Sequence, residues 1–406
     1  MLSLAPLAAL LILGFLAPGI ASSGQGATKS PISVPITKQT QHFHRVDSTI
    51  VDFDKLNAHL TYVRNKYSRT FANFRANTGV AHPLQDQDLT LQEQLRQASG
   101  TVALKDFKDM LWTGRIAFGQ PAQSVVVQFD TGSTDTVVTR GAYVPERSST
   151  SVRTSKRFNA TYADGTSASG IVYKDTVTIG GLQAPSAAIG LSDSQFLDPE
   201  NEGGCQGISG LAFQNASSFK LPGFFDSLSS AGVLSAPVFS FRLATTGSTL
   251  TLGGYDKAHI SGAITWLPVD PIYGFWTVPG RVNGFGPLPY IVMDTGAPTI
   301  VAPVADALTL FKNLGMQIRH EDGMVYGVFP CSAPPKITFT FAGRIVTMAG
   351  AWQTLGKDSD GACISSIIGF NLWLRRTWIF GDPFLRSVIS IFDKGQNRFG
   401  LATPAR

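Results

Sequence analysis

Two aspartates, Asp130 and Asp294, stand in matching surroundings 164 residues apart. Each ends an apolar run, Val125–Phe129 in the first copy and Tyr290–Met293 in the second, and each precedes Thr-Gly and a small residue. Two carboxylates that share a site cannot both ionise easily, so one becomes an acid and the other a base. The repeat therefore predicts two lobes that bring the aspartates together to activate water for hydrolysis, with no metal or other cofactor.

The residues beside each aspartate suit this task. Gly132 and Gly296 are expected to permit the unusual dihedral angles of a sharp turn. The hydroxyls of Thr131 and Thr295 can hydrogen-bond across to the other loop, and the hydroxyl of Ser133 can donate to the first carboxylate. A single Asp-Thr-Gly is a weak signal, because an ordinary β-turn or the phosphate-binding turn of an actin-like ATPase also contains it.

A second pair of matching elements follows the aspartates. Ile208–Leu211 and Ile379–Asp382 are apolar stretches that contain Gly210 and Gly381. A glycine there would let a second segment approach the aspartate loop closely. Matching elements upstream and downstream make the duplication a strong signal.

From Val102 onward the sequence predicts an all-β protein. Short apolar runs alternate with Gly, Pro, Asp and Ser, and dipeptides such as Asp164-Gly165 mark turns. Helical patterns are expected over Asp54–Phe74 and Ala305–Leu314.

The N-terminal part differs from this body. Residues 1–21 resemble a secretory signal peptide with a small residue at Ala21, although no Lys or Arg precedes the apolar stretch; the alternative is a membrane anchor. Residues 22–101 contain no cysteine and few glycines, which indicates a pro-segment rather than a domain. We expect a secreted, extracellular protein, with a vacuolar location as the less favoured alternative, and no association with membranes.

Cysteines, glycosylation motifs and charge add further expectations. Cys331 and Cys363 are expected to form a disulfide, which leaves Cys205 as a buried apolar residue. Asn159 and Asn215 begin Asn-X-Ser/Thr sequons, which matter if the chain is secreted. Residues 102–406 contribute only +2 of the net charge of +5, and no basic stripe is present, so nucleic acid is not an expected partner.

These features together resemble the pepsin-like aspartic peptidases over residues 102–406. The resemblance implies a bilobal fold of two related β-barrel-like lobes, 102–262 with Asp130 and 263–406 with Asp294, and an active-site cleft between them. The short pro-segment and the Asp in the flap are most similar to secreted fungal members. The stretches that carry the resemblance are Trp112–Pro121, Asp130–Ser133, Tyr162–Thr166, Gly207–Leu211, Thr251–Asp256, Gly274–Trp276, Asp294–Gly296, Trp378–Asp382 and Val388–Leu401.

The resemblance also implies an activity, an aspartic-type endopeptidase of class EC 3.4.23. Asp130 and Asp294 would flank a water, one carboxylate taking its proton while the protonated partner assists the peptide carbonyl and then the leaving nitrogen. Pepsin itself is the established example of such a dyad with split acidity, so operation at acidic pH is implied by the resemblance and not by these residues alone. Protein and peptide substrates, inhibition by pepstatin-type compounds and a monomeric state are expected.

Roles in substrate binding follow from the same resemblance. Tyr162 corresponds to the flap tyrosine that covers substrate, and Asp164, Gly165 and Thr166 complete the flap tip. Asp164 would accept a basic residue before the scissile bond, or it is simply a turn residue. Ile208 and Phe275 are expected to line the cleft, together with Phe196.

Lys66-Tyr67 resembles the inhibitory pair of pepsin-like propeptides. An ammonium between the two aspartates would keep both ionised and block the cleft, and acid would release it and allow self-cleavage. The alternative is an ordinary solvated lysine on a helix. We expect the mature chain to begin between Gln94 and Leu104.

Two positions depart from the family pattern. Ala297 stands where most members carry Thr or Ser, which removes a hydrogen-bond donor near Asp294 and should extend activity to less acidic pH. Val137 stands where a Trp usually bonds to the flap Tyr, so Tyr162 should be held less firmly.

Two other functions are weighed against the peptidase. A catalytically inactive protein of the pepsin fold, such as a plant-type glycosidase inhibitor, typically lacks an Asp or the flap Tyr, whereas Asp130, Asp294 and Tyr162 are all present. An actin-like ATPase would need a nucleotide site and cytosolic residence, which the signal segment and β-rich texture oppose. Hydrophobic residues, with tolerance of Lys, are expected in the substrate subsites.

Overall fold

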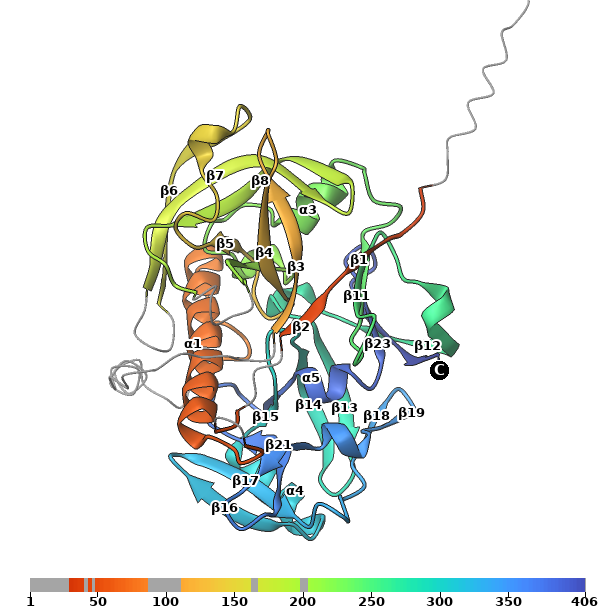
Figure 1. Ribbon diagram of the computed structural model, residues 1–406. Helices are drawn as coiled ribbons and strands as arrows, with labels where there is room; N and C mark the ends of the chain where they lie inside the picture. The colour runs from red at the N-terminus through yellow and green to blue at the C-terminus, as the bar shows by residue number, and fades with distance from the viewer. Residues whose placement is uncertain are drawn as a thin grey trace, which may run out of the picture.

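The computed structural model describes residues 29–39, 43–45, 48–86, 111–161, 167–197 and 204–405. It shows two β-rich lobes, one above the other in Figure 1, with a shared sheet between them. The expected all-β, bilobal architecture is thus confirmed. Its helices are α1 (Phe53–Thr78), α3 (Phe224–Ser230), α4 (Val304–Asn313) and α5 (Asp382–Leu385).

The sheet of the N-terminal lobe has the order β2-β3-β4-β9-β5-β8-β7-β6. Its strands are β2 (Thr37–Gln39), β3 (Leu111–Phe118), β4 (Gln123–Asp130), β5 (Thr136–Val138), β6 (Val152–Thr161), β7 (Ser167–Ile179), β8 (Leu182–Ser192) and β9 (Gly207–Gly210). The apolar run that precedes the first aspartate forms β4, whose last four residues are buried because the strand lies inside the sheet. It pairs in parallel with β9, which places Asp130 opposite Gly210.

The sheet of the C-terminal lobe repeats this arrangement. Its path is β16-β17-β21-β15-β22-β14-β13-β18-β19, and β20 pairs with β21. The strands are β13 (Thr277–Val282), β14 (Gly286–Met293), β15 (Ile300–Ala302), β16 (Gln317–Glu321), β17 (Met324–Phe329), β18 (Thr338–Phe341), β19 (Arg344–Thr347), β20 (Thr354–Lys357), β21 (Cys363–Gly369) and β22 (Thr377–Phe380). Strand β14 pairs in parallel with β22 as β4 does with β9, and β15 then pairs antiparallel with β22 as β5 does with β9. The sequence repeat therefore corresponds to a repeated strand topology.

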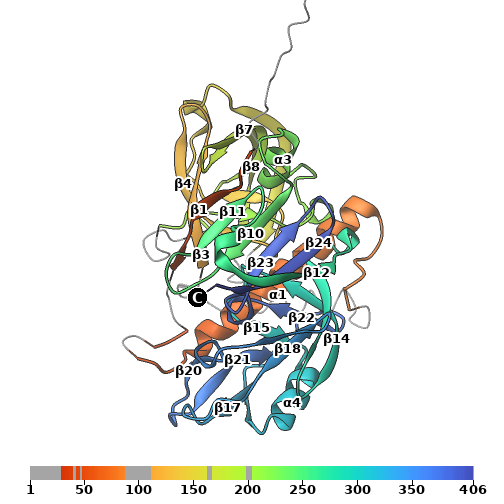
Figure 2. The same ribbon diagram turned by 90° about the vertical axis from the view of Figure 1, so that its right-hand side faces the viewer.

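A six-stranded sheet joins the lobes, with the order β1-β11-β10-β23-β24-β12 (Figure 2). Its strands are β1 (Ile32–Pro35), β10 (Val238–Arg242), β11 (Thr249–Leu252), β12 (Ile260–Pro268), β23 (Ile389–Asp393) and β24 (Arg398–Pro404). Phe239 and Phe392 stack at 4.8 Å in its core. Because β23 and β24 return to this sheet and β12 spans residue 262, the exact lobe division at 262/263 stays a prediction.

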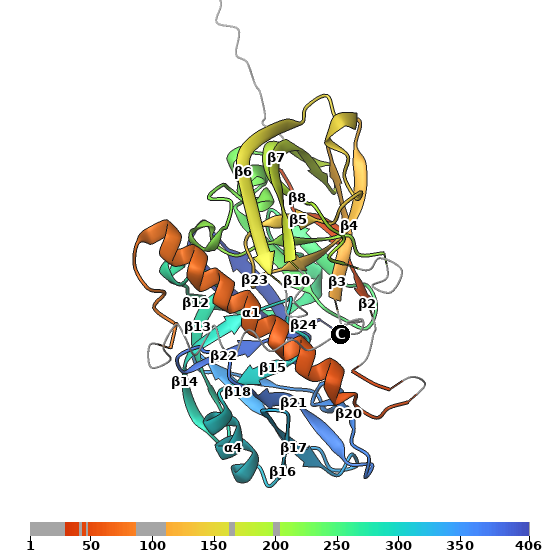
Figure 3. The same cartoon turned by 90° about the vertical axis from the view of Figure 1, so that its left-hand side faces the viewer.

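The N-terminal segment is built into the body at three places. Strand β1 forms an edge of the six-stranded sheet, β2 extends the N-terminal sheet, and α1 crosses between the lobes (Figure 3). Asp52 caps α1 by accepting a hydrogen bond from the Lys55 amide, and Gly79 ends it with a positive φ of 80°. One face of α1 is buried because apolar residues recur at helical spacing: Leu56, Leu60, Val63, Tyr67, Phe71 and Phe74.

The remaining expectations about cysteines and helices also have clear outcomes. Cys331 and Cys363 form the expected disulfide, and Cys205 is buried outside it. Helix α4 covers the predicted stretch within a residue of each end. In the part of the chain that the structure describes, no helix has both the length and the apolar character to cross a membrane.

Candidate active site

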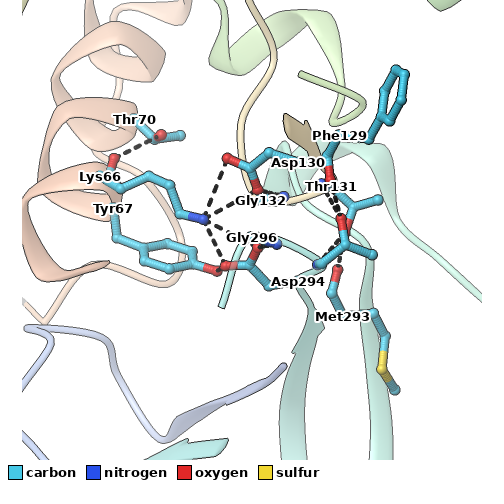
Figure 4. Close-up of polar contacts among 11 residues, drawn as sticks. Lys66, Tyr67, Thr70, Phe129, Asp130, Thr131, Gly132, Met293, Asp294 and Gly296 are labelled. Atoms are coloured by element: carbon cyan, nitrogen blue, oxygen red, sulfur yellow. Dashed lines mark hydrogen bonds and ion pairs between the residues drawn. The ribbon is translucent and has the colours of Figure 1, made fainter. Parts of the chain in front are cut away.

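The two Asp-Thr-Gly loops meet at the junction of the lobes and are held by a reciprocal set of hydrogen bonds (Figure 4). The hydroxyl of Thr131 donates to the Met293 carbonyl at 2.8 Å and accepts from the Thr295 amide at 2.9 Å. The hydroxyl of Thr295 donates to the Phe129 carbonyl at 2.7 Å and accepts from the Thr131 amide at 3.0 Å. The two threonines thus fix the loops to each other, as their types and positions predicted.

Gly132 and Gly296 provide space rather than special dihedral angles. Neither is among the residues with positive φ, so the unusual dihedral angles that were expected are not the reason for glycine. A Cβ on Gly132 would lie 2.5 Å from the Asp294 carboxylate, and one on Gly296 would lie 2.3 Å from Asp130 Oδ1. Their amides also donate to the carboxylates of their own loops, at 2.8 and 2.9 Å respectively. Each glycine therefore makes room for the aspartate of the other lobe.

The downstream glycines allow a second close approach, as expected. A Cβ on Gly210 would lie 2.3 Å from the Thr134 backbone, and one on Gly381 would lie 1.9 Å from the Ala297 carbonyl oxygen. The Leu211 amide donates to the Asp130 carbonyl at 2.9 Å, and the Asp382 amide donates to the Ala297 carbonyl at 2.8 Å. The residues that follow β9 and β22 thus brace the two loops, although they bond to different residues of the two motifs.

Helix α1 places Lys66 between the aspartates. Its Nζ lies 3.2 Å from Asp130 Oδ1 and 2.8 Å from Asp294 Oδ2, and all three side chains are buried. The Tyr67 hydroxyl donates to Asp294 Oδ2 at 2.9 Å, while its ring packs on Phe275 with centroids 5.0 Å apart. The lysine is therefore not a solvated helix residue, and the site is closed by the chain's own N-terminal segment.

The pKa values of the two aspartates are driven apart. Burial raises the pKa of Asp294 to about 6; the charge of Asp130 adds to the shift, and Lys66 opposes it. For Asp130, burial acts in the same direction but is outweighed by the charge of Lys66 and by hydrogen bonds, so its pKa lies below the ordinary value. Burial disfavours the Lys66 ammonium, yet the two carboxylates raise its pKa and keep it charged.

The small residues after the two motifs make the loops unequal. Ser133 lies near the Asp130 carboxylate and helps to lower its pKa, although its buried Oγ reaches hydrogen-bond geometry with no partner among the described residues. Ala297 occupies the matching position beside Asp294, where it is 1% exposed and has no side-chain donor. The first carboxylate is therefore the better supported of the two in its ionised form.

The expected substrate-binding residues lie on both sides of α1. Ile208 and Val137 line a small cavity of about 70 Å³ beside Lys66, in which Tyr62 of α1 also participates. Phe275 is fully buried under Tyr67, and Phe196 packs at the edge of the cluster that contains Ile208. Ile208, Val137 and Phe275 therefore lie against the helix that crosses between the lobes.

Several predicted residues lie outside the described part of the chain. These are the flap residues Tyr162, Asp164, Gly165 and Thr166, the signal segment 1–21 and the expected mature start at 94–104. Of the sequon residues, Asn159 is exposed on β6. Asn215 is half-buried, and its Nδ2 already donates to the Pro271 and Ile272 carbonyls at 2.9 and 3.2 Å, so a glycan there would compete with these bonds.

Sequence reasoning missed how the N-terminal segment is recognised. Asn77 Nδ2 donates to the carbonyls of Asn215 and Ser217 at 3.0 and 2.9 Å, and Asn73 Nδ2 donates to that of Ala216 at 3.4 Å. The spacing of four residues between the two asparagines places both amides on one helix face, which was the available signal. Lys38 of β2 lies 3.7 Å from the buried Asp382 carboxylate, and no local pattern marks that pair.

Asp135 is a second missed residue, and it anchors the loop of Asp130. It is half-buried and accepts hydrogen bonds from the hydroxyls of Ser217 and Ser218 at 2.5 Å and from the Ser218 amide at 2.7 Å. Burial raises its pKa. Its place five residues after Asp130 in the same loop could have drawn attention to it.

Comparison with known proteins agrees with this geometry. The model of the family described as "Eukaryotic aspartyl protease" matches residues 111–404. The chain is 36% identical to Secreted aspartyl protease 1 of Malassezia globosa, covering 96% of this chain and 97% of that protein. It is 34% identical to an aspartic protease of Phaffia rhodozyma (93% and 92% covered) and 29% identical to pepsin A of Sus scrofa (75% and 84% covered). This protein therefore belongs to the eukaryotic aspartyl proteases, the pepsin-like aspartic endopeptidases.

Proposed function

We propose that this chain is a secreted aspartic endopeptidase that cleaves proteins at acidic pH and is made as a self-activating zymogen. The observation that carries the proposal is Lys66 Nζ, which lies within 3.4 Å of all four carboxylate oxygens of Asp130 and Asp294. A cation in that position occupies the space that a catalytic water needs. Residues 22–101 are thus proposed as the activation segment, and the body from 102 as the enzyme.

In the open enzyme the two carboxylates would share the work of peptide hydrolysis. Lys66 is absent from the open site, but the Ser133 hydroxyl and the Gly132 amide, which help to lower the pKa of Asp130, remain. Ala297 offers Asp294 no hydroxyl, which favours Asp130 as the base that takes a proton from water. Asp294 would then hold the proton that polarises the peptide carbonyl and that finally goes to the leaving nitrogen. The threonine bonds keep the two carboxylates at a fixed separation, which is the positioning that this chemistry requires.

Acid would open the zymogen because docking of Lys66 depends on ionised partners. The pKa of Asp130 is lower in the docked state than its ordinary value of 3.8. The docked state is therefore stabilised above that pH and loses this stabilisation as pH falls through the lowered pKa. Release of α1 would expose the carboxylates and let the chain cut its own N-terminal segment.

The remaining roles are proposed by likeness to relatives and by position. Tyr162 with Asp164, Gly165 and Thr166 would form the flap, and Ile208 and Phe275 would contact substrate. Secretion into the extracellular space is supported by the printed name of the Malassezia relative, a secreted aspartyl protease. A monomer is proposed because both aspartates lie in one chain, and pepstatin-type compounds are the expected inhibitors.

The test is proteolysis by the purified full zymogen. Denatured haemoglobin is incubated with it from pH 2.5 to pH 7, with and without pepstatin, beside the variants Asp130→Asn and Asp294→Asn. We expect pepstatin-sensitive cleavage that appears at acidic pH together with a shortened chain, and no cleavage by either variant. Intact substrate at every pH would contradict the proposal and would favour an inactive binding protein of this fold.

A further inference from the structure

His82 lies in an enclosed aromatic site just beyond the end of α1. Its side chain is 0% exposed, and its ring centroid lies 4.6 Å from that of Phe71, 4.7 Å from that of Phe74 and 5.6 Å from that of Phe275. The first two rings come from α1 and the third from the body of the enzyme. A buried histidine joins the N-terminal segment to the C-terminal lobe at this point and makes no hydrogen bond to either aspartate.

The hydrogen bonds of His82 specify a neutral ring of one tautomer. The Leu84 amide donates to Nδ1 at 3.1 Å, so Nδ1 carries no proton. Nε2 lies 2.8 Å from the Tyr273 carbonyl, which can only accept, so Nε2 carries the proton. A second proton on Nδ1 would face the Leu84 N–H and would leave a cation enclosed by three phenyl rings.

The segment that follows depends on this arrangement. The Leu84 side chain is 0% exposed. The backbone carbonyl of Leu84 accepts a hydrogen bond from the Arg375 amide at 2.8 Å, and the Asp86 amide donates to the Trp373 carbonyl at 3.0 Å. Residues 82–86 are thereby fixed along the C-terminal lobe. They end eight residues before Gln94, the first position at which the mature chain is expected to begin.

We propose that His82 is an acid-sensitive latch, separate from Lys66, whose protonation releases residues 80–86 from the C-terminal lobe. The inference rests on the proposed function, in which residues 22–101 are an activation segment. Release of this segment would allow the chain beyond Asp86 to move into the opened active site for cleavage. The two latches hold different parts of the segment, so each can be tested alone.

The surroundings of His82 determine how docking of the segment changes with pH and over which pH values. Burial lowers the pKa of His82 from 6.5 to about 4, and the bond to the Tyr273 carbonyl opposes that shift; no charged group contributes. The docked segment therefore binds fewer protons than the released one between these values, and docking weakens as pH falls. The equilibrium constant for docking of the segment falls about tenfold per pH unit in this range, roughly 300-fold in all. The titratable groups close in sequence to the residues that pack on the ring are Tyr67, Arg69 and Arg75 on α1, Asp86 beyond Leu84, Asp270 and Tyr273 before Phe275, and Arg375, whose amide bonds to Leu84.

Hydrogen exchange on the full zymogen tests the latch directly. An Asp130→Asn background prevents self-cleavage and, in every variant compared, removes the titration of the Lys66–Asp130 pair, so the pH dependence that His82→Gln removes can be assigned to His82. Exchange of the amides of residues 84–86 is followed from pH 7 to pH 3.5, divided by the intrinsic rate at each pH and referred to the value at pH 7 in the same background. We expect opening to rise about 300-fold, mostly between pH 6.5 and 4. His82→Gln, which offers a neutral acceptor and donor, should flatten that rise, whereas His320→Gln on the exposed part of β16 should leave it unchanged.

If His82→Gln already releases the segment at pH 7, its exchange profile no longer tests protonation of the ring. Nitrogen-15 spectra of the imidazole rings in the chain with His82 then provide the test. We expect an unprotonated Nδ1 and a protonated Nε2 at pH 7, with Nδ1 gaining its proton near pH 4 as the amides open. Opening of the amides while the ring stays neutral, or an equal pH dependence in His82→Gln, would overturn the latch. Failure of the proposed function would show separately, as full proteolytic activity of the uncleaved zymogen at pH 7.

Discussion

Replacement of Lys66 by Met is the sharpest test of how the site is closed. The side chain is of similar length, but the ammonium that lies 3.2 and 2.8 Å from the two carboxylates is lost. Removing one partner of a buried ion pair costs about 3–5 kcal/mol, because the remaining charge is left uncompensated. At about 1.36 kcal/mol per power of ten, this weakens docking of α1 by between two and four powers of ten.

The expected consequence is activation at higher pH. The lowered pKa of Asp130 depends on docked Lys66, so the variant also loses the acid dependence that this pair gives to docking. Conversion of Lys66→Met should therefore begin at higher pH than that of the unsubstituted chain and should depend less steeply on pH. Conversion is followed by gel electrophoresis after incubation at half-unit steps from pH 3 to pH 7, and the new N-terminus is sequenced.

A matched control comes from the same helix. Lys55 pairs with Asp52 at 3.5 Å, but both side chains are about a quarter exposed, so the pair should contribute at most about 1 kcal/mol. Lys55→Met should therefore convert at nearly the same pH as the unsubstituted chain. An unchanged midpoint in Lys66→Met, or equal shifts in both variants, would refute the view that the buried ion pair closes the site.

Three further predictions address the loops and the disulfide. Ala297→Ser supplies a donor beside Asp294 and should move the pH–rate profile of the activated enzyme toward acid by about one unit, a shift that kcat/KM profiles on a quenched peptide would detect. Gly296→Ala places a Cβ 2.3 Å from Asp130 Oδ1 and should lower kcat at least about 100-fold while far-ultraviolet circular dichroism stays native. Replacing both Cys331 and Cys363 by Ser opens a loop of 32 residues and should cost about 4 kcal/mol in urea unfolding of the inactive Asp130→Asn zymogen; a loss under 1 kcal/mol would contradict it.

The sequence was sufficient to predict the parts of the site that are encoded locally. The apolar runs before Asp130 and Asp294 predict buried strands, and the repeat predicts that their ends meet. Lys66 could be placed only through resemblance to relatives, because nothing in the sequence around it specifies two partners more than 60 residues away.

Contacts that depend on packing between distant segments could not be predicted from the sequence. The pairing of β1 with β11 joins residues more than 200 positions apart, and several apolar strands of similar length would have served equally well. The role of Gly132 and Gly296 was misjudged for the same reason: the clash that excludes a side chain comes from the opposite lobe. His82 gave no signal at all, since its aromatic neighbours come from two separate elements.

The glycine in each Asp-Thr-Gly loop leaves the space that the catalytic aspartate of the other lobe occupies. A side chain at Gly296 would displace the Asp130 carboxylate, and one at Gly132 would displace the Asp294 carboxylate. The two residues of these pairs are 166 and 162 positions apart along the chain. Neither half contains a complete site, so neither can be selected for alone. After the duplication, the two loops could diverge in the residue that follows glycine, Ser133 against Ala297, but not in the glycine itself.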